Sequence, residues 1–316
     1  MTKILTSSDH HGNWESLEHW FKYASKHNLP FIIPGDVVGD YNFEELAIKK
    51  GLKLPNIQIE NENTKKLKKL FNQILEYHAK KLANLIEKYK VKTYFLLGNH
   101  EPIYFPELVN KNLKQKELFI DLLKEKGLTK INGFKICAIS NTYQLMYFLS
   151  YIYTEKELEE MFPHQLMQRP TIINFNKEKL KEYKEPYEDP DWIRINQDEI
   201  DDLDIFITHG QIGRGAWRKE KYATELPTLL SAAKLSAKAK ITIDAHLHTT
   251  HTMRNCLEKP TIRAVGNKAF LIEKDKENQL SIEELECDAP YKAKEAGPTL
   301  KDLEEIKSPV DKFLGI

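Results

Sequence analysis

The sequence of 316 residues lacks the features that mark secreted and membrane proteins. It has only three Cys residues, at wide spacings, so it predicts neither a disulfide framework nor a Cys-based zinc site. No apolar run approaches the roughly 18 residues that a membrane-spanning helix needs. The apolar stretch near the N-terminus is only Ile4 and Leu5, which is too short for a signal peptide. We therefore expect a cytoplasmic protein that does not engage a membrane.

The sequence also lacks an excess of either charge. Lys and Arg number 47, Asp and Glu number 47, and the formal net charge is +0. Proteins that bind the backbone of nucleic acids usually carry a basic excess, so extended nucleic acid is not the expected partner. Arg is scarce as well, with six residues among the 47 basic ones. Because a guanidinium can bind a phosphate through two parallel hydrogen bonds, each Arg is a candidate anion ligand.

What the chain does contain is an alternation of short apolar runs and helical patterns. Apolar residues at helical spacing predict helices over 14–24, 64–90 and 113–126, the last of which Gly127 would end. Short apolar runs predict strands over residues 3–8, 31–33, 93–97, 134–140, 204–208, 241–244, 261–265 and 269–272. Strands that alternate with helices indicate an α/β fold.

Polar residues follow five of these predicted strands directly. They are Asp9 and His11, Asp36, Asn99 and His100, His209, and His246 and His248. Taken singly, each cluster is more often a turn or a helix cap than a metal site. In open α/β sheets, however, ligands gather outside the carboxyl ends of the strands. Five such ends would bring together nitrogen and oxygen ligands suited to Zn, Mn or Fe, without the thiolates of a structural zinc site.

These clusters resemble the motifs of the calcineurin-like metallophosphoesterase superfamily. The matching segments are Asp9-His10-His11, Gly35-Asp36, Gly98-Asn99-His100-Glu101, Thr208-His209-Gly210 and Ala245-His246-Leu247-His248. The resemblance implies an α+β sandwich, in which two packed mixed β-sheets are flanked by helices and the metal site lies at the strand carboxyl ends. The resemblance covers residues 9–248 and does not account for two further segments. Composition predicts an insertion or cap at about 141–199 within a domain over 1–287, and a charged C-terminal surface tail over 288–316.

The same resemblance implies two divalent metal ions that share Asp36. Asp9, His11 and His248 would complete the first site, and Asn99, His209 and His246 the second. A metal-bound hydroxide would attack the phosphorus atom, because two cations can polarise a phosphoryl group and acidify water. His100 would not bind metal but would face the leaving-group oxygen as a proton or hydrogen-bond donor. Glu101 or another acid would fix the tautomer of His100.

The motif after Gly35-Asp36 leaves the substrate open. The protein Ser/Thr phosphatase branch, which other motifs of the chain partly resemble, carries an Asp-Arg pair near this point. This chain has Gly39, Asp40 and Tyr41 there, so that branch's phosphate-binding Arg is missing. Arg214, in a Gly-flanked loop after His209, is a candidate phosphate ligand, although a solvated loop cation fits the sequence equally well.

The expected activity is metal-dependent hydrolysis of a phosphate ester, with a phosphomonoesterase favoured. Phosphorylated small molecules, nucleotides and phosphoproteins are all open as substrates. The alternative enzyme is a phosphodiesterase or nuclease that acts on nucleotides. A non-catalytic scaffold is the third hypothesis, and the complete set of seven ligand positions together with His100 argues against it.

Overall fold

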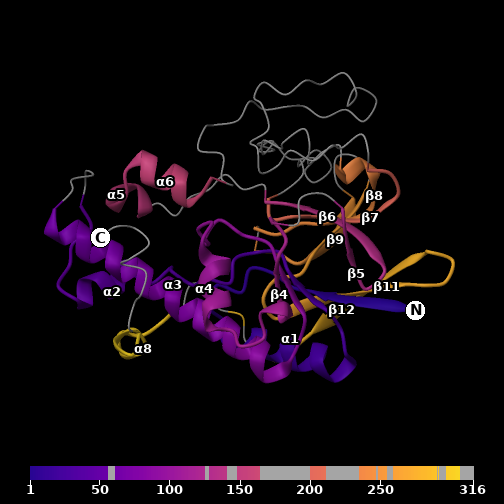
Figure 1. Ribbon diagram of the computed structural model, residues 1–316, viewed down its shortest axis with the longest axis horizontal. Coiled ribbons are helices and arrows are strands. Elements are labelled where there is room, and N and C mark those ends of the chain that lie inside the picture. The colour runs from indigo at the N-terminus through magenta and orange to yellow at the C-terminus, as the bar shows by residue number, and fades with distance from the viewer. Residues whose placement is uncertain are drawn as a thin grey trace, which may run out of the picture.

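The computed structural model describes residues 1–55, 61–124, 128–140, 148–163, 200–210, 235–246, 248–254, 259–289, 291 and 297–306. Within these residues the chain forms two six-stranded sheets with helices at their flanks (Figure 1). The expected architecture of two mixed sheets flanked by helices is confirmed.

The first sheet combines the first four strands of the chain with two strands from its later part. It comprises β1 (Thr2–Thr6), β2 (Phe31–Ile33), β3 (Thr93–Phe95), β4 (Phe119–Asp121), β11 (Lys268–Lys274) and β12 (Leu280–Glu286). Their order is β12-β11-β1-β2-β3-β4. The first four strands are parallel, whereas β11 runs antiparallel to β1 and to β12. The carboxyl ends of β1, β2 and β3 therefore lie side by side.

The second sheet supplies the later strands. It comprises β5 (Thr129–Ile131), β6 (Phe134–Ile139), β7 (Leu203–Thr208), β8 (Ala239–Ile243), β9 (His251–Arg254) and β10 (Pro260–Arg263). Their order is β5-β6-β7-β8-β10-β9, and β6, β7, β8 and β10 are parallel. A parallel bridge between Ser8 and Val265 connects the end of β1 to the segment after β10.

The side chains of the first sheet point alternately to its two faces, and each face forms part of a separate hydrophobic core. Neighbouring side chains of a strand point to opposite faces. Leu5, Phe31 and Ile33 therefore pack against the helices, in one buried cluster. Ile4 and Ile32 point the other way and pack with residues of the second sheet, in another. One sheet thus separates a helix-facing core from a sheet-facing core.

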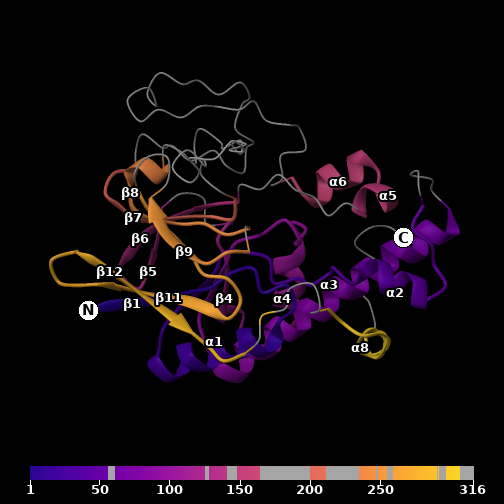
Figure 2. The same cartoon turned by 180° about the vertical axis from the view of Figure 1, so that it is seen from behind.

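The helices form a layer on the outer side of the first sheet. They are α1 (Trp14–His27), α2 (Phe43–Lys49), α3 (Glu62–Tyr89), α4 (Phe105–Asn112), α5 (Leu149–Ile152), α6 (Glu155–Met161) and α8 (Leu300–Glu304). In this layer α2, α5 and α8 pack on α3, and α6 packs on α5. The long α3 begins at a capping box between Asn61 and Thr64 and ends at Lys90 in a left-handed conformation. Both views show α1 and α4 lying along α3 (Figure 1, Figure 2).

One expected helix is wrong. The described part of residues 113–126 forms a short 3-10 helix, Lys116–Leu118, and then strand β4. The strand β4 pairs with β3, and this pairing places Phe119 in the buried core on the helix-facing side of the sheet. A short apolar run can suit a buried strand as well as a helix, and here pairing with β3 decides the outcome.

The described part of the expected insertion, residues 148–163, packs closely on the helical layer. Phe148 stacks on Phe43 with ring centroids 4.2 Å apart, and Tyr153 is buried beside Phe71. These aromatic side chains anchor α5 and α6 to α2 and α3. Among the described residues, no helix has both the length and the apolar character needed to cross a bilayer.

Candidate active site

The ends of five parallel strands supply the candidate side chains. Asp9 follows β1, Asp36 follows β2, and Asn99 follows β3. From the second sheet, His209 follows β7 directly and His246 follows β8. All seven sequence-predicted metal ligands lie within the described residues. The two-sheet arrangement therefore brings the five strand ends to one place.

Four of these ligand residues have an unusual backbone. The φ angles of Asp9, His11, Asp36 and His246 are 52°, 45°, 55° and 71°. A left-handed conformation costs a residue with a side chain roughly 1–2 kcal/mol. Such residues persist where the surrounding structure holds them, and they are common at functional sites. These sharp turns direct side chains from the strand ends toward one another.

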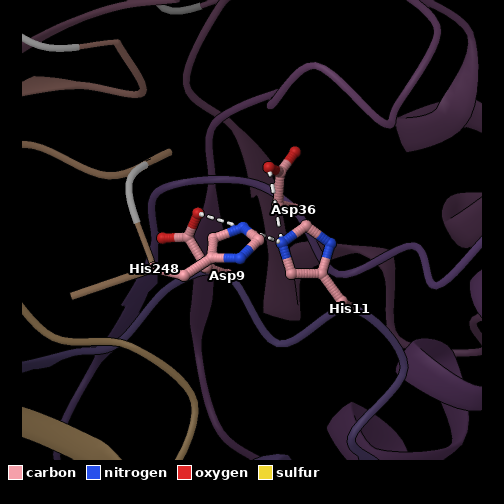
Figure 3. A group of neighbouring side chains, drawn as sticks. All are labelled: Asp9, His11, Asp36 and His248. Carbon is pink, nitrogen blue, oxygen red and sulfur yellow. Dashed lines mark hydrogen bonds and ion pairs between the residues drawn. The ribbon is translucent and has the colours of Figure 1, made fainter. Parts of the chain in front are cut away.

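The first ligand group contains Asp9, His11, Asp36 and His248, and each offers one ligand atom within 4.8 Å of the others. Figure 3 shows the His11 and His248 rings meeting between the two carboxylates. Their Nε2 atoms lie 2.8 Å apart, and His11 Nε2 lies 3.7 Å from Asp36 Oδ2. Three of the four side chains are buried, whereas that of His248 is 35% exposed.

The second ligand group contains Asp36, His209 and His246, with Asn99 beside them. His209 Nε2 lies 3.1 Å from Asp36 Oδ2 and 3.1 Å from Asn99 Oδ1. His246 Nδ1 lies 2.8 Å from the same Asn99 oxygen. His209 Nδ1 is 2.6 Å from the carbonyl oxygen of Pro34, to which it donates, so Nε2 is left as the ligand atom.

Asp36 belongs to both groups because its Oδ2 atom lies near a histidine of each, His11 and His209. Oδ1 accepts a hydrogen bond from the backbone N–H of His100 at 3.2 Å. Oδ2 has no hydrogen-bond partner and lies between His11 and His209. Only glycine fits at position 98, because a Cβ atom there would lie 2.0 Å from Asp36 Oδ1. The close approach of these two loops therefore fixes the direction of the carboxylate.

The donor set fits divalent cations of the Zn, Mn or Fe type. Asp9 Oδ1 and Asp36 Oδ2 are buried without a hydrogen-bond partner, a costly state for a carboxylate unless a cation offsets it. Burial lowers the pKa of His246 to about 3 and that of His11 well below its usual value. Both rings are then neutral, which is the form that binds metal.

His100 lies beside the ligand groups, and its ring is oriented by an acid that the sequence interpretation did not single out. His100 Nδ1 is 2.6 Å from Asp40 Oδ1, and both side chains are buried. Burial disfavours the charged ring, but the negative charges of Asp40 and Asp36 outweigh it and raise the pKa of His100 to about 10. The contact with Asp40 therefore fixes the orientation of the His100 ring through Nδ1.

Glu101 has a different task from orienting His100. Its carboxylate accepts hydrogen bonds from the backbone N–H groups of Asp36, Val38 and Gly98, at 3.0, 2.8 and 2.9 Å. Glu101 is fully buried. Glu101 therefore joins the loop after β2 to the loop after β3. The acid that orients the His100 ring is Asp40 instead.

Tyr41 is a further residue that the motifs did not identify as part of the site. Its ring centroid lies 5.1 Å from that of His11 and 5.2 Å from that of His100. The only sequence signal is its place next to Asp40, shortly after a strand end. Arg214, the predicted phosphate ligand, lies outside the described residues.

Comparisons with known proteins agree with this geometry. A family model described as calcineurin-like phosphoesterase matches residues 2–254. A search of the curated proteins finds no match. One crystal structure aligns over 90% of this chain and 98% of its own, with 12% identity and a TM-score of 0.53, which supports a common fold.

Two further solved structures align at lower similarity. A hypothetical protein from Thermus thermophilus aligns over 90% of this chain and 99% of its own, with 10% identity and a TM-score of 0.38. A protein serine/threonine phosphatase from Saccharomyces cerevisiae, described as similar to human phosphatase PP5, aligns over 90% and 80%, with 10% identity and a TM-score of 0.31.

The role of Glu101 can be tested by Glu101→Gln. The amide would present one acceptor oxygen and one donor nitrogen to three N–H groups, so at least one buried N–H would lose its partner. We expect the free energy of unfolding to fall by about 1–3 kcal/mol in urea titrations. Glu117→Gln, at an exposed position, is the matched control and should change stability by less than about 0.5 kcal/mol. Equal stability of the two variants would contradict the role.

Proposed function

The chain belongs to the calcineurin-like phosphoesterase family, and from this premise we propose that it is a phosphomonoesterase that uses two divalent cations. The first ligand group would hold one cation and the second group the other. The proposed ligands are Asp9, His11, Asp36, Asn99, His209, His246 and His248. The observation that carries the proposal is the position of the buried Asp36 Oδ2, which lies between His11 and His209 and within reach of both groups.

Bound in this way, the two cations would offset charge on the phosphoryl oxygens and lower the pKa of an attacking water. Mn, Fe and Zn all suit a set of imidazole, carboxylate and amide ligands. The residues of the chain have their own tasks. Asp36 is buried and directed by the His100 N–H, so it would keep both ligand groups in register without having to reorganise during the reaction.

We propose that His100 donates a proton or hydrogen bond to the leaving-group oxygen. Its contact with Asp40 fixes the ring, so that Nε2 is the nitrogen available to the substrate. His100 belongs to neither ligand group, although its backbone N–H bonds Asp36. A donor that sits beside the metal ligands without joining them is suited to assist departure of an alcohol.

Arg214 is the proposed phosphate ligand, on the strength of its sequence position alone. The substrate would be a phosphorylated small molecule, a nucleotide or a phosphoprotein. We infer a cytoplasmic location, because Cys137 and Cys287 are free buried thiols. Phosphodiester hydrolysis of nucleotides is the alternative, and the same two-cation site would serve it.

The proposed function is tested with p-nitrophenyl phosphate and bis-p-nitrophenyl phosphate, after chelation and again after manganese is added back. We expect the monoester to be hydrolysed only in the presence of metal, and faster than the diester. Asp36→Asn should lower the metal-dependent rate by at least about 100-fold, since it removes the shared charge. A preference for the diester would favour the alternative, and an Asp36→Asn variant with full turnover would refute the bridging role.

The assignment of His100 is tested by comparing His100→Ala with His248→Ala. We expect His100→Ala to lower kcat by about 10²–10⁴-fold while the protein keeps both metal ions, because a proton donor is lost and no ligand is. His248→Ala should instead lose one metal ion. Kinetics and elemental analysis of the same preparations measure both effects. Loss of metal from His100→Ala would make His100 a ligand rather than a donor.

A further inference from the structure

The segment after the family match contacts the candidate active site. The match ends at residue 254, whereas Tyr291 lies against the loop after β1. The Tyr291 hydroxyl donates a hydrogen bond of 2.7 Å to the backbone carbonyl oxygen of Asp9. Asp9 is a member of the first ligand group and has a φ of 52°. A residue 282 positions away in the chain therefore bonds the strained peptide that carries a ligand.

The Tyr291 ring has a defined seat next to this hydrogen bond. It lies so close to Gly266 that a Cβ atom at that position would be 2.0 Å from ring atom Cδ2. The Gly266 N–H in turn donates to the carbonyl oxygen of Ser8 at 3.0 Å. The ring is thus seated on a glycine that hydrogen-bonds the residue before Asp9, and this seat fixes where the Tyr291 hydroxyl points.

The described residues downstream of Tyr291 are anchored at two more points. The side chain of Asn42, which follows Asp40 and Tyr41 in the sequence, donates to the carbonyl oxygen of Pro298 at 2.9 Å. Thr299 caps α8 with Asp302, and Leu303 is fully buried in the helix-facing core against α3. Described residues of the C-terminal segment therefore contact Asp9, Asn42 and α3. Figure 2 shows α8 beside α3.

We propose that Tyr291 is a positioning residue that holds Asp9 in the orientation needed by the first ligand group. This inference depends on the proposed two-cation function. The Asp9 N–H donates to Gly35 O at 3.2 Å, so hydrogen bonds hold both sides of this residue. Removing the one on the carbonyl side frees the peptide after Asp9 to rotate, and the carboxylate moves with it.

The effect is specific to the first ligand group. The residues of the second group are held by contacts of their own, from His209 to Pro34 O and from His246 to Asn99 Oδ1. Asp36, which the groups share, is held by the His100 N–H. Loss of the Tyr291 hydroxyl thus weakens one cation site and leaves the other unchanged.

The experiment measures Mn²⁺ binding to metal-free protein by titration calorimetry. Tyr291→Phe removes the hydroxyl and keeps the ring on Gly266. Tyr23→Phe, which removes the hydroxyl of a half-buried tyrosine on α1, is the matched control. Each is introduced into two backgrounds, His246→Ala and His248→Ala. The first background leaves the first ligand group intact, and the second leaves the second group intact.

We expect Tyr291→Phe to weaken Mn²⁺ binding about three- to tenfold in the His246→Ala background, the usual effect of losing one hydrogen bond. In the His248→Ala background it should change binding less than about twofold, and Tyr23→Phe should have no effect in either. Unchanged binding in the first background, or equal weakening in both, would overturn the proposal. Failure of the proposed function has a separate signature, namely fewer than two Mn²⁺ ions bound by the unmodified protein.

Discussion

The buried carboxylates of Asp9 and Asp36 are the constraint on which the rest of the site depends. Each has an oxygen atom without a hydrogen-bond partner, and both residues are almost completely shielded from water. Burying an unpaired carboxylate is costly, and the surrounding histidines offset this only in part. Their backbones are also held in the left-handed region. Two divalent cations would offset the electrostatic cost of burying these carboxylates. The folded protein should therefore favour binding of metal ions at Asp9 and Asp36.

Hydrogen bonds from residues outside the candidate ligand groups hold the site in its conformation. Glu101 joins the loops after β2 and β3 through three backbone hydrogen bonds, and Asp40 orients the His100 ring. Tyr291 reaches the Asp9 peptide from the far end of the chain. None of these three belongs to the metal-ligand set. Each acts on the direction of a ligand or donor, which is how a rigid site is preorganised for charge that develops during a reaction.

The place where the candidate ligand side chains meet was predictable from sequence, because several of them follow parallel strands. Polar residues after buried strands lie at one edge of a sheet, so the proximity of Asp9, Asp36, Asn99 and His209 could be predicted without coordinates. The acid that contacts His100 could not be predicted, because the path of the turn after β2 determines whether Asp40 or Glu101 reaches the ring. The contact of Tyr291 could not be predicted either, since Tyr291 and Asp9 lie 282 positions apart in the chain. The error at β4 has a similar cause, because pairing with β3 overrides a helix-like pattern.

The sharing of Asp36 by two cations can be tested by anomalous diffraction from crystals of the protein grown with manganese. We expect two anomalous peaks about 3.5–4 Å apart, both within coordination distance of the Asp36 carboxylate. One of them should lie beside Asp9, His11 and His248, and the other beside Asn99, His209 and His246. A single peak, or a pair of peaks away from Asp36, would show that Asp36 is not shared.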